Sequence, residues 1–434
     1  MSSPFLRSVA SVATRYDAHS QSRVVGAVAA RGRERRGHNQ TISMPLDIQL
    51  WSYNYAPEPT GIGPVSTAWA CAMRDRGHEI EVIAAHPHYP EAAWGRSFKP
   101  YRERRDGIDV LRLPLWFGRS SPLARIRQEL SFAAIQTAAL PALRRPDVMV
   151  VVSPSFPALM PAMFRARMRR VPWVLWLQDI LPDGAATTGL IADGRAVRAA
   201  RQLERRAYAR ASSIVVISES FERNLLAKGV RAGKLHRVYN PATLAFAADH
   251  AQQGDSRGLR LLVMGNIGHS QGLDEFVHMF EEIGDPDATL VVTGTGVAAE
   301  EVRAQIRSDR VKMLGVVDQT RLEHELSHAT AGVVSQRSDI VEFNVPSKLM
   351  NYMMRGLPVI ALARPEAEVS RIVTQAGAGW VVSDRSGVTA AMDALRDDEL
   401  RRQTGAAAAD FARARFSVEH FAENFERAIV AAVD

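Results

Sequence analysis

The sequence predicts an α/β fold of two doubly wound, Rossmann-like domains that face each other across a cleft. From residue 47 onward, short apolar runs alternate with amphipathic helical stretches, which is typical of parallel sheets covered by helices on both faces. The alternation stops at the polar stretch 249–258 and then restarts. A glycine-bearing turn follows the first apolar run of each half, at 54–64 and again at 265–273.

Each half is expected to contain six strands, because its apolar runs are four to six residues long and rich in β-branched residues. Helices are expected between them, for example at 64–76 and 196–211, with a final amphipathic helix at 417–433. The predicted strands are 47–51, 79–84, 109–113, 148–153, 173–177 and 213–218 in the first half, then 260–265, 289–293, 311–316, 332–335, 358–363 and 379–382.

These elements divide the chain into a first domain at 45–245, a second at 256–415 and a helix at 416–434 that packs back on the first domain. Residues 1–44 hold seven arginines against two acidic residues, and so carry +5 of the net charge of +7. They lack the apolar core of a signal peptide and are expected to be a disordered extension or to precede the true start at Met44. A basic arm for nucleic acid is the alternative, but no interleaved aromatic residues support it.

Composition limits the classes of function. Hydrophobic residues make up 46% of the 434 positions and charged residues 23%, as in ordinary globular proteins. The single cysteine, Cys71, excludes disulfides within the chain and cysteine-based metal sites. A reducing cytoplasm fits this usage. No run of about twenty apolar residues predicts a transmembrane helix.

The stretch 344–361 predicts a loop, a short helix, a glycine stop and a buried strand. Asn344 or Ser347 is expected to cap the helix, since either side chain can accept from first-turn N–H groups, and Pro346 needs no N–H there. Lys348 stands where the helix begins. Free N–H groups, a favourable dipole and a lysine suit a phosphate; the alternative is an ordinary crossover helix with Lys348 solvated.

Two glycine loops are candidate ligand contacts. Gly61 and Gly63 open the helix after the first strand, and Gly265 and Asn266 follow the first strand of the second half. Glycine lets backbone N–H groups approach a ligand that side chains would otherwise block. In both places an ordinary tight turn is the competing explanation.

Charged residues at strand ends complete the candidate site. Asp179 follows the apolar strand 173–177, where a carboxylate can accept a proton or orient a hydroxyl, or can simply cap the next turn. Arg337, Asp339 and Glu342 precede the short helix. The arginine could neutralise phosphate and the carboxylates could hold sugar hydroxyls; a solvated charged loop is the alternative.

The histidines give weaker signals. His86 and His88 have a spacing that could hold a metal, but no third ligand lies nearby in the sequence, so no metal site is expected. His269 is expected to form a hydrogen bond within its loop rather than to act in catalysis. Gly294 and Gly296 are expected to turn the chain rather than touch a ligand.

From about Met44 to its end the chain resembles the family 4 glycosyltransferases, retaining enzymes of the two-domain GT-B fold that use nucleotide-sugar donors. It is most similar to the bacterial O-antigen, capsule and exopolysaccharide branch, which includes N-acetylfucosamine-type transferases. The wider resemblance rests on the residues at 55–58, 61–63, 76–82, 216–218, 239–241 and 356–360. The branch patterns are Gln-Asp-x-x-Pro at 178–182, Gly-Asn-x-Gly at 265–268 and Pro-Ser-Lys at 346–348.

The chain departs from the wider family at several functional positions. The usual pair of glutamates, eight residues apart, would fall at Phe343 and Asn351, with Glu342 one place early. Asn266 and Gln271 stand where the family carries an arginine and a lysine. Gln178 and Asp179 stand where many members carry a histidine.

The resemblance implies roles for these residues. Lys348, Ser347, Gly265 and Asn266 would stabilise the donor diphosphate, with Gly61 and Gly63 closing from the first domain. Asn351 would hold the ribose, Arg337 would assist at the donor, Glu342 could replace the displaced glutamate, and Asp179 would orient or deprotonate the acceptor. Neither a metal nor a cofactor is expected.

The implied activity is transfer of a sugar, such as an N-acetylated deoxy-amino sugar, to an undecaprenyl-diphosphate-linked saccharide. The enzyme would lie in the cytoplasm, at the inner face of the plasma membrane. Arginines flank the apolar run 130–143 within 119–145, and this segment could lie on a bilayer or be a core-facing helix with basic ends. A nucleotide-sugar epimerase on the same fold and a catalytically silent donor-binding partner remain alternatives.

Overall fold

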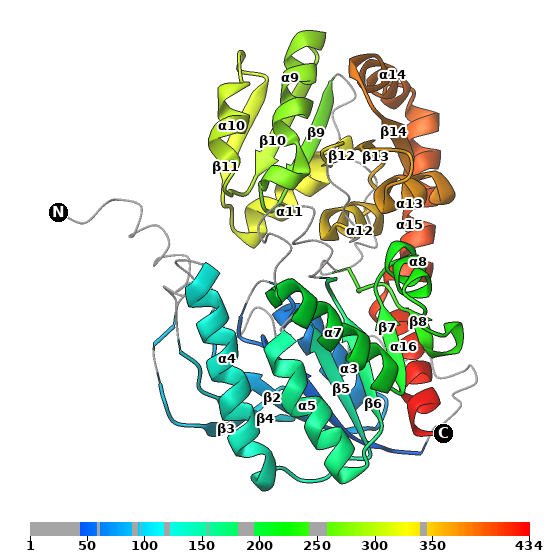
Figure 1. Cartoon of the computed structure of the whole chain (residues 1–434). Helices are drawn as coiled ribbons and strands as arrows, with labels where there is room; N and C mark the ends of the chain where they lie inside the picture. Colours follow the sequence, from blue (N-terminus) through cyan, green and yellow to red (C-terminus); the bar gives the residue numbers. More distant parts are fainter. Residues whose placement is uncertain are drawn as a thin grey trace, which may run out of the picture.

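A computed structural model of the chain describes residues 44–58, 61–88, 94–95, 97–116, 122–153, 156–180, 195–242, 258–338 and 345–434. The predicted N-terminal extension, apart from Met44, lies outside these residues. The chain forms two α/β domains, each built around one sheet (Figure 1). The predicted fold of two Rossmann-like domains is therefore confirmed.

The first sheet has eight strands in the order β3-β4-β2-β1-β5-β6-β7-β8. All neighbours in it are parallel except β3 and β4, which are antiparallel. Its strands are β1 (Asp47–Ser52), β2 (Glu79–Ala85), β3 (Tyr101–Arg105), β4 (Ile108–Leu113), β5 (Val148–Ser153), β6 (Trp173–Leu177), β7 (Ser213–Val216) and β8 (Leu235–Arg237).

The second sheet has six parallel strands in the order β11-β10-β9-β12-β13-β14. The chain order changes direction beside β9, so the loops after β9 and β12 lie next to each other at the carboxyl edge. Doubly wound folds bind ligands at such a switch point. The strands are β9 (Leu259–Met264), β10 (Ala288–Thr293), β11 (Val311–Gly315), β12 (Ala331–Ser335), β13 (Val359–Leu362) and β14 (Gly379–Val382).

The sequence pattern predicted the central strands but missed β3 and β8. The central strands are buried on both faces and read as continuous apolar runs. Both missed strands lie at edges of the first sheet. β3 has the sequence YRERR and β8 the sequence LHR, because an edge strand faces water and carries charges that block further pairing.

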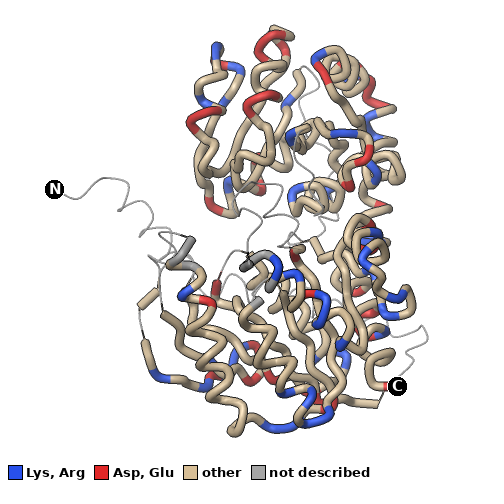
Figure 2. Tube along the Cα trace, viewed as in Figure 1, with Lys and Arg blue, Asp and Glu red and all other residues tan. Residues whose placement is uncertain are grey.

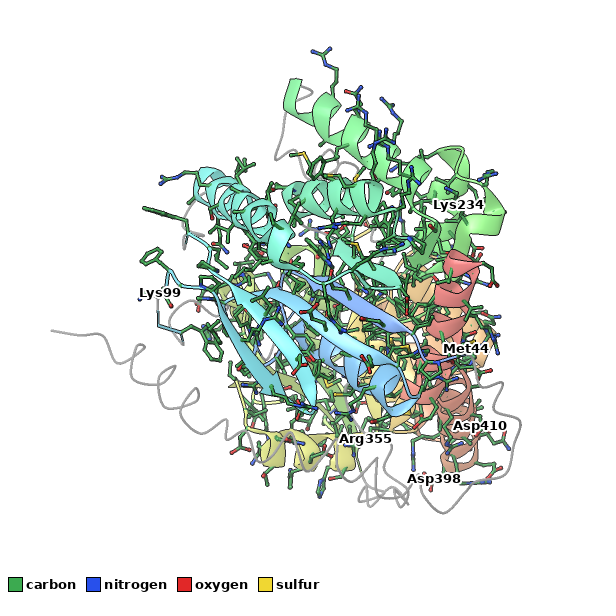
Figure 3. The ribbon with its side chains drawn as sticks, turned by 90° about the horizontal axis from the view of Figure 1, so that it is seen from below. Met44, Lys99, Lys234, Arg355, Asp398 and Asp410 are labelled. Carbon is green, nitrogen blue, oxygen red and sulfur yellow. The ribbon has the colours of Figure 1, made fainter. Side chains whose placement is uncertain are left out.

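Helices cover both faces of each sheet. In the first domain, α3 and α16 lie on one face, and α4, α5 and α7 on the other, which is clearest from below (Figure 3). The helices of this domain are α3 (Gly63–Asp75), α4 (Pro122–Ala139), α5 (Phe156–Arg169), α7 (Arg195–Arg210) and α8 (Glu219–Ala227). Those of the second are α9 (Leu273–Ile283), α10 (Ala299–Ala304), α11 (Gln319–His328), α12 (Ser347–Met354), α13 (Glu368–Ala376), α14 (Arg385–Leu395) and α15 (Asp398–Phe416). Single 3₁₀ turns lie at Leu140–Ala142, Ala232–Lys234 and His269–Gln271.

The last helix, α16 (Val418–Val433), belongs to the core of the first domain although α15 belongs to the second. Phe421 and Phe425 pack their rings against Trp176, and Phe425 also contacts Trp69. Ser417 separates the two helices and caps α16 by accepting from the backbone N–H of His420. The chain thus returns to the first domain at Ser417, where α15 ends and the capped helix α16 begins.

A second contact between the domains centres on Glu368 at the start of α13. Its carboxylate accepts from the backbone N–H groups of Glu219 and Ser220, at 3.0 and 3.1 Å, and so caps α8 of the first domain. Arg371 donates to the same carboxylate at 2.6 Å. Burial alone would raise the pKa of Glu368, but these hydrogen bonds outweigh it and lower that pKa.

The segment 119–145, which was expected either to lie on a bilayer or to face the core, contains both buried and exposed apolar residues. Phe132, Ala133 and Leu143 are buried in the first core, as expected for a core-facing helix, while Leu130 is exposed. Arg144, one of its basic residues, is paired with Asp47 at 2.6 Å. No helix in the described part of the chain is both long enough and apolar enough to cross a bilayer.

Candidate functional site

The loop after β9 is held by close backbone contact with the loop after β10. A Cβ at Gly294 would lie 1.9 Å from the carbonyl oxygen of Gly265, and one at Gly296 would lie 2.2 Å from that of Ile267. Both positions therefore require glycine for packing, in agreement with the expectation that they shape the chain. The result leaves Gly265, with φ of 92°, and Asn266 exposed at the carboxyl edge of the sheet.

Helix α12 begins beside this loop, on the side of the second domain that faces the first (Figure 1). Pro346 occupies the cap position, and among the described residues no side chain caps the helix. The expected capping by Ser347 is wrong, because Ser347 is the first residue inside the helix and is exposed; Asn344 lies outside the described residues. An uncapped first turn leaves the positive end of the helix dipole available to an anion.

Lys348 joins the start of α12 to the β9 loop. Its residue is only 8% exposed, and its Nζ donates to Oε1 of Gln271 at 3.0 Å. A solvated lysine, the alternative interpretation, is excluded by this burial. Gln271 holds the ammonium group at the helix start, which places a positive charge where the helix dipole is also positive.

Tyr352 sets the position of α12 against β9. Its hydroxyl donates to the carbonyl oxygen of Leu262 and accepts from the N–H of Met264, both at 2.9 Å. The ring lies over Gly332 of β12, where a Cβ would come within 2.3 Å of it. Complete burial raises the pKa of Tyr352, so the hydroxyl keeps its proton and bridges the two β9 groups.

The other candidate residues of the second domain surround the same point. Asn351 is buried on α12. Arg337, after β12, is half-buried, and its backbone N–H donates to the carbonyl oxygen of Ser270 at 2.9 Å. A Cβ at Gly272 would lie 2.9 Å from Cγ of Arg337, so this glycine admits the arginine. Asp339 and Glu342 lie outside the described residues.

Arg355, which is labelled in Figure 3, lies at the C-terminal end of α12. Its Nη2 donates to Glu323 of α11 at 2.6 Å. A cation at a helix C-terminus complements the dipole there. Helix α12 is therefore fixed at its middle by Tyr352 and at its end by Arg355, while its first turn faces the β9 loop.

In the first domain, the structure requires glycine at Gly61 and at Gly63 for different reasons. Gly61 is exposed with φ of 66°, a conformation that glycine adopts without strain. A Cβ at Gly63 would lie 2.9 Å from the carbonyl oxygen of Glu58, so that glycine allows close packing. Helix α3, which begins there, has no side-chain cap in the described part of the chain and no acidic residue in its first turn.

His88 is paired with a carboxylate. Oε1 of Glu58 accepts from the backbone N–H of His88 at 2.9 Å and lies 3.3 Å from its Nδ1, and both residues are buried. Asn54 donates to the other oxygen of Glu58 at 3.0 Å. No group of three or more potential metal ligands occurs among the described side chains. The sequence did not single out Glu58 as the partner of His88.

Asp179 and Gln178 follow β6. Gln178 exchanges two hydrogen bonds with Asn240, at 2.8 and 3.0 Å, and so ties the end of β6 to the stretch before the second domain. Asp179 is half-buried beside this amide pair. Nδ1 of His269 lies 3.2 Å from the exposed carboxylate of Glu301 on α10, so its hydrogen-bond partner lies outside the loop in which it was expected.

The structure therefore brings together residues of the second domain that the sequence placed far apart: Gly265, Asn266, Gln271, Arg337, Lys348 and Asn351. Gly61, Gly63 and Asp179 lie at the carboxyl edge of the first sheet. Sequence reasoning missed Tyr352 and Glu368. Tyr352 sits among buried methionines of a helix, and the one available signal was Gly332, a residue that strands usually avoid.

Two family profiles match the chain, one on each domain. The profile described as "Glycosyl transferase 4-like domain" matches residues 60–241. The profile described as "Glycosyl transferases group 1" matches residues 258–398.

Two curated relatives are similar to this chain in sequence, and both of their names are provisional assignments. WcaI of Escherichia coli (strain K12), a glycosyl transferase assigned to colanic acid biosynthesis, is 25% identical over 88% of this chain and 98% of its own. WbjE of Pseudomonas aeruginosa, assigned as a glycosyltransferase, is 25% identical over 60% of this chain and 68% of its own.

Solved structures share the fold. HepE (Alr3699) of Anabaena, in complex with UDP and glucose, aligns with a TM-score of 0.63 at 16% identity, over 89% of this chain and 99% of that chain. Sucrose-phosphate synthase (tll1590) of Thermosynechococcus elongatus aligns with a TM-score of 0.65 at 16% identity, over 88% and 98%. With both profiles and both relatives in agreement, the chain belongs to the family 4 glycosyltransferases of the GT-B fold.

Proposed function

We propose that this chain transfers a sugar from a nucleoside-diphosphate sugar to an acceptor hydroxyl, with retention at the anomeric carbon, during assembly of a bacterial cell-surface polysaccharide. The name of WcaI, which refers to colanic acid biosynthesis, supports the pathway class. HepE, solved in complex with UDP and with UDP-glucose, supports a nucleotide-sugar donor. An N-acetylated deoxy-amino sugar remains the proposed class of the transferred group.

The observation that carries the proposal is the position of Lys348. Its buried ammonium group lies at the uncapped start of α12, held by Gln271 from the loop that also contains Gly265 and Asn266. Departure of the nucleoside diphosphate develops negative charge on its terminal phosphate. Fixed positive groups aimed at that charge stabilise the transition state more than the substrate.

The remaining roles follow from position. Ser347 and the loop at Gly265 and Asn266 would bind the diphosphate, assisted by Arg337, and Asn351 would hold the ribose. Gly61 and Gly63, at the start of α3, would close on the donor from the first domain. Glu342 is proposed to contact the transferred sugar.

Asp179 is proposed to act on the acceptor. It follows β6 at the carboxyl edge of the first sheet, where a carboxylate can orient the acceptor hydroxyl and take its proton as the new bond forms. The proposed acceptor is an undecaprenyl-diphosphate-linked saccharide. The protein is proposed to lie in the cytoplasm. Such an acceptor would bring it to the inner face of the plasma membrane.

The proposed chemistry requires no metal or cofactor, because Lys348, Arg337 and two helix starts provide the positive potential. Activity is therefore expected to persist in EDTA, measured as nucleotide release. Loss of activity in EDTA that returns on adding Mg²⁺ or Mn²⁺ would contradict this part of the proposal.

The function is tested by incubating the purified chain with a panel of nucleotide sugars, with and without a lipid-linked acceptor. We expect release of nucleoside diphosphate that depends on the acceptor. Interconversion of sugars without acceptor would identify an epimerase, and binding without turnover would identify a silent partner; either would overturn the proposal.

With a donor and acceptor identified, Lys348→Ala is expected to lower kcat on the order of a hundredfold or more, because it removes one preorganised charge from the diphosphate. Lys312→Ala, an exposed lysine of β11 in the same domain, is the matched control and should leave kcat unchanged. Activity of Lys348→Ala within a few-fold of wild type would exclude the role.

A further inference from the structure

Three helices form one continuous outer face of the first domain. α4 packs on α5 and α5 packs on α7, all on the same side of the sheet (Figures 1 and 3). Each follows a strand and runs back along the sheet, so each begins at the carboxyl edge where the candidate site lies. The outward side of this layer therefore borders the site.

The outward side of α5 is apolar. Met160, Phe164 and Met168 recur at every fourth residue, which places them on one stripe of the helix, and they are 52%, 54% and 64% exposed. The inward side of α5 is also apolar, with Leu159, Met163 and others buried in the core. A surface helix of a globular domain normally carries polar residues on its outward side. The outward stripe is thus not explained by the fold of the domain.

The neighbouring helix α4 carries a second apolar stripe. Ile126 and Leu130 are each more than half exposed, and Ala134 and Ala138 continue the same spacing as exposed residues. The two stripes lie on adjacent helices of one layer. Contiguous apolar surface of this kind marks an interaction site in a soluble protein.

Positive charge flanks the apolar stripes. The two carboxylates of the three helices are Glu129, which is half-buried, and Glu204, which is buried and paired with Tyr208 and Lys228. Figure 2 shows the basic residues of α7 gathered beside the largely uncharged turns of α4 and α5. Among the described side chains of this layer, the exposed arginines are Arg127, Arg167, Arg169, Arg198, Arg205, Arg206 and Arg210.

An exposed tryptophan lies at the edge of the face. Trp116 is 57% exposed, with the guanidinium of Arg127 over its ring at 5.8 Å. Its backbone N–H donates to Ser131 of α4 at 2.9 Å, which fixes it to this layer. Tryptophan is favoured where an apolar medium meets water, because its ring is apolar and its N–H is polar.

We propose that the outer face of α4, α5 and α7 docks on an anionic lipid bilayer. The stripes of α4 and α5 enter the boundary between headgroups and acyl chains, and the arginines contact anionic headgroups. A second copy of the chain fits less well, since a twofold contact through this face would bring its arginines toward one another. The bilayer contact stands apart from the transfer reaction; its use in presenting a lipid-linked acceptor rests on the proposed function.

Flotation of the full chain with vesicles tests the surface without any turnover. We expect the wild type to float with vesicles of phosphatidylcholine and phosphatidylglycerol, and far less with phosphatidylcholine alone or at high salt. Arg205→Glu with Arg206→Glu is expected to weaken binding by at least about tenfold. Met160→Ser, Phe164→Ser and Met168→Ser together should weaken it similarly, through loss of apolar burial.

Matched controls sit in the second domain. Arg303→Glu with Lys312→Glu reverses two exposed charges there, and Leu400→Ser removes an exposed apolar residue; both should float as the wild type does. Failure of the wild type to bind anionic vesicles, or equal binding by the α5 and α7 variants, would overturn the proposal. A dimer in light scattering that Phe164→Ser abolishes would assign the face to a second copy instead.

The two proposals fail separately. The α5 and α7 variants should retain wild-type transfer to a short-chain, water-soluble acceptor, because the site is unchanged. Vesicle binding by a chain without transferase activity would leave the surface standing and remove the proposed function. Transfer activity without vesicle binding would leave the proposed function standing and remove the proposed bilayer contact.

Discussion

Tyr352 shows how one side chain can position a site that it does not touch. Its hydroxyl completes hydrogen bonds for two backbone groups of β9, and β9 leads directly into the loop at Gly265. The same helix carries Lys348 one turn earlier. The distance between Lys348 and the β9 loop therefore depends on a tyrosine that only Gly332 signals in the sequence.

Tyr352→Phe is expected to lower the free energy of unfolding by about 1–3 kcal/mol, because it leaves the N–H of Met264 and the carbonyl oxygen of Leu262 buried without that partner. Since α12 and the β9 loop would separate slightly, KM for the donor should rise as well. Thermal denaturation and steady-state kinetics measure the two effects. Tyr101→Phe, at an exposed edge strand, is the control; an unchanged midpoint for Tyr352→Phe would contradict the account.

Asp179→Asn is expected to reduce kcat by about a hundredfold or more, because an amide can hydrogen-bond the acceptor but cannot take its proton. Thermal stability should change little, since the side chain is half-buried and keeps its shape. Asp309→Asn, at an exposed position, serves as the control. Wild-type kcat in Asp179→Asn would remove this residue from the mechanism.

At the scale of elements, the candidate site depends on helix α12 lying directly on β12. Gly332 is the residue that permits this, because any Cβ there would meet the ring of Tyr352. The sequence predicted both elements at nearly their observed bounds. It could not predict their separation, which is set by a contact between two residues twenty positions apart.

Gly332→Ala is therefore expected to destabilise the second domain by about 1–3 kcal/mol through overpacking, and to weaken nucleotide binding by moving α12. Gly233→Ala, where a Cβ would meet nothing within 4 Å, is the matched control. Denaturant unfolding and calorimetric titration measure the two effects. Combining Gly332→Ala with Tyr352→Ala should recover part of the stability relative to the sum of the single changes; strict additivity would argue against the contact.

At the scale of the whole molecule, the described residues include two contacts between the domains. Glu368 of α13 caps α8, and the N–H of Ala242 donates to the carbonyl oxygen of Phe416 at 2.9 Å. The second contact joins the two segments in which the chain passes between the domains, one after Ala242 and the other at the end of α15. Burial, and next the charge of Glu368, raise the pKa of Tyr239 to about 12, so its hydroxyl stays protonated within 3.4 Å of that carboxylate.

Glu368→Gln is expected to lower the unfolding midpoint at neutral pH, with a loss of about 1.5–3 kcal/mol from charge-assisted hydrogen bonds. The pKa of Glu368 lies below its ordinary 4.5, so its contribution is present above about pH 4.5 and lost as pH falls through the lower folded value. The difference between wild type and variant should therefore shrink below pH 4.5. A difference that is constant from pH 7 to pH 3 would contradict this assignment.

Much of the architecture could be predicted because parallel strands buried on both faces leave continuous apolar runs, as at 148–153 and 173–177. Edge strands such as β3 leave no such pattern. For the site, the sequence located Lys348 and Gly265 individually, since helix starts and glycine turns are local features. It could not locate the Gln271, Glu58 and Glu368 contacts, because each joins segments far apart in the chain.

Lys348 and the start of α12 are proposed to bind the donor diphosphate. Calorimetric titration of the preferred nucleoside diphosphate, chosen by a thermal-shift screen and compared with its nucleoside, tests this most directly. We expect Lys348→Ala to weaken diphosphate binding by roughly 10–100-fold and to leave nucleoside binding unchanged, and we expect Lys312→Ala to bind both as the wild type does. Equal affinity of Lys348→Ala and wild type for the nucleoside diphosphate would contradict it.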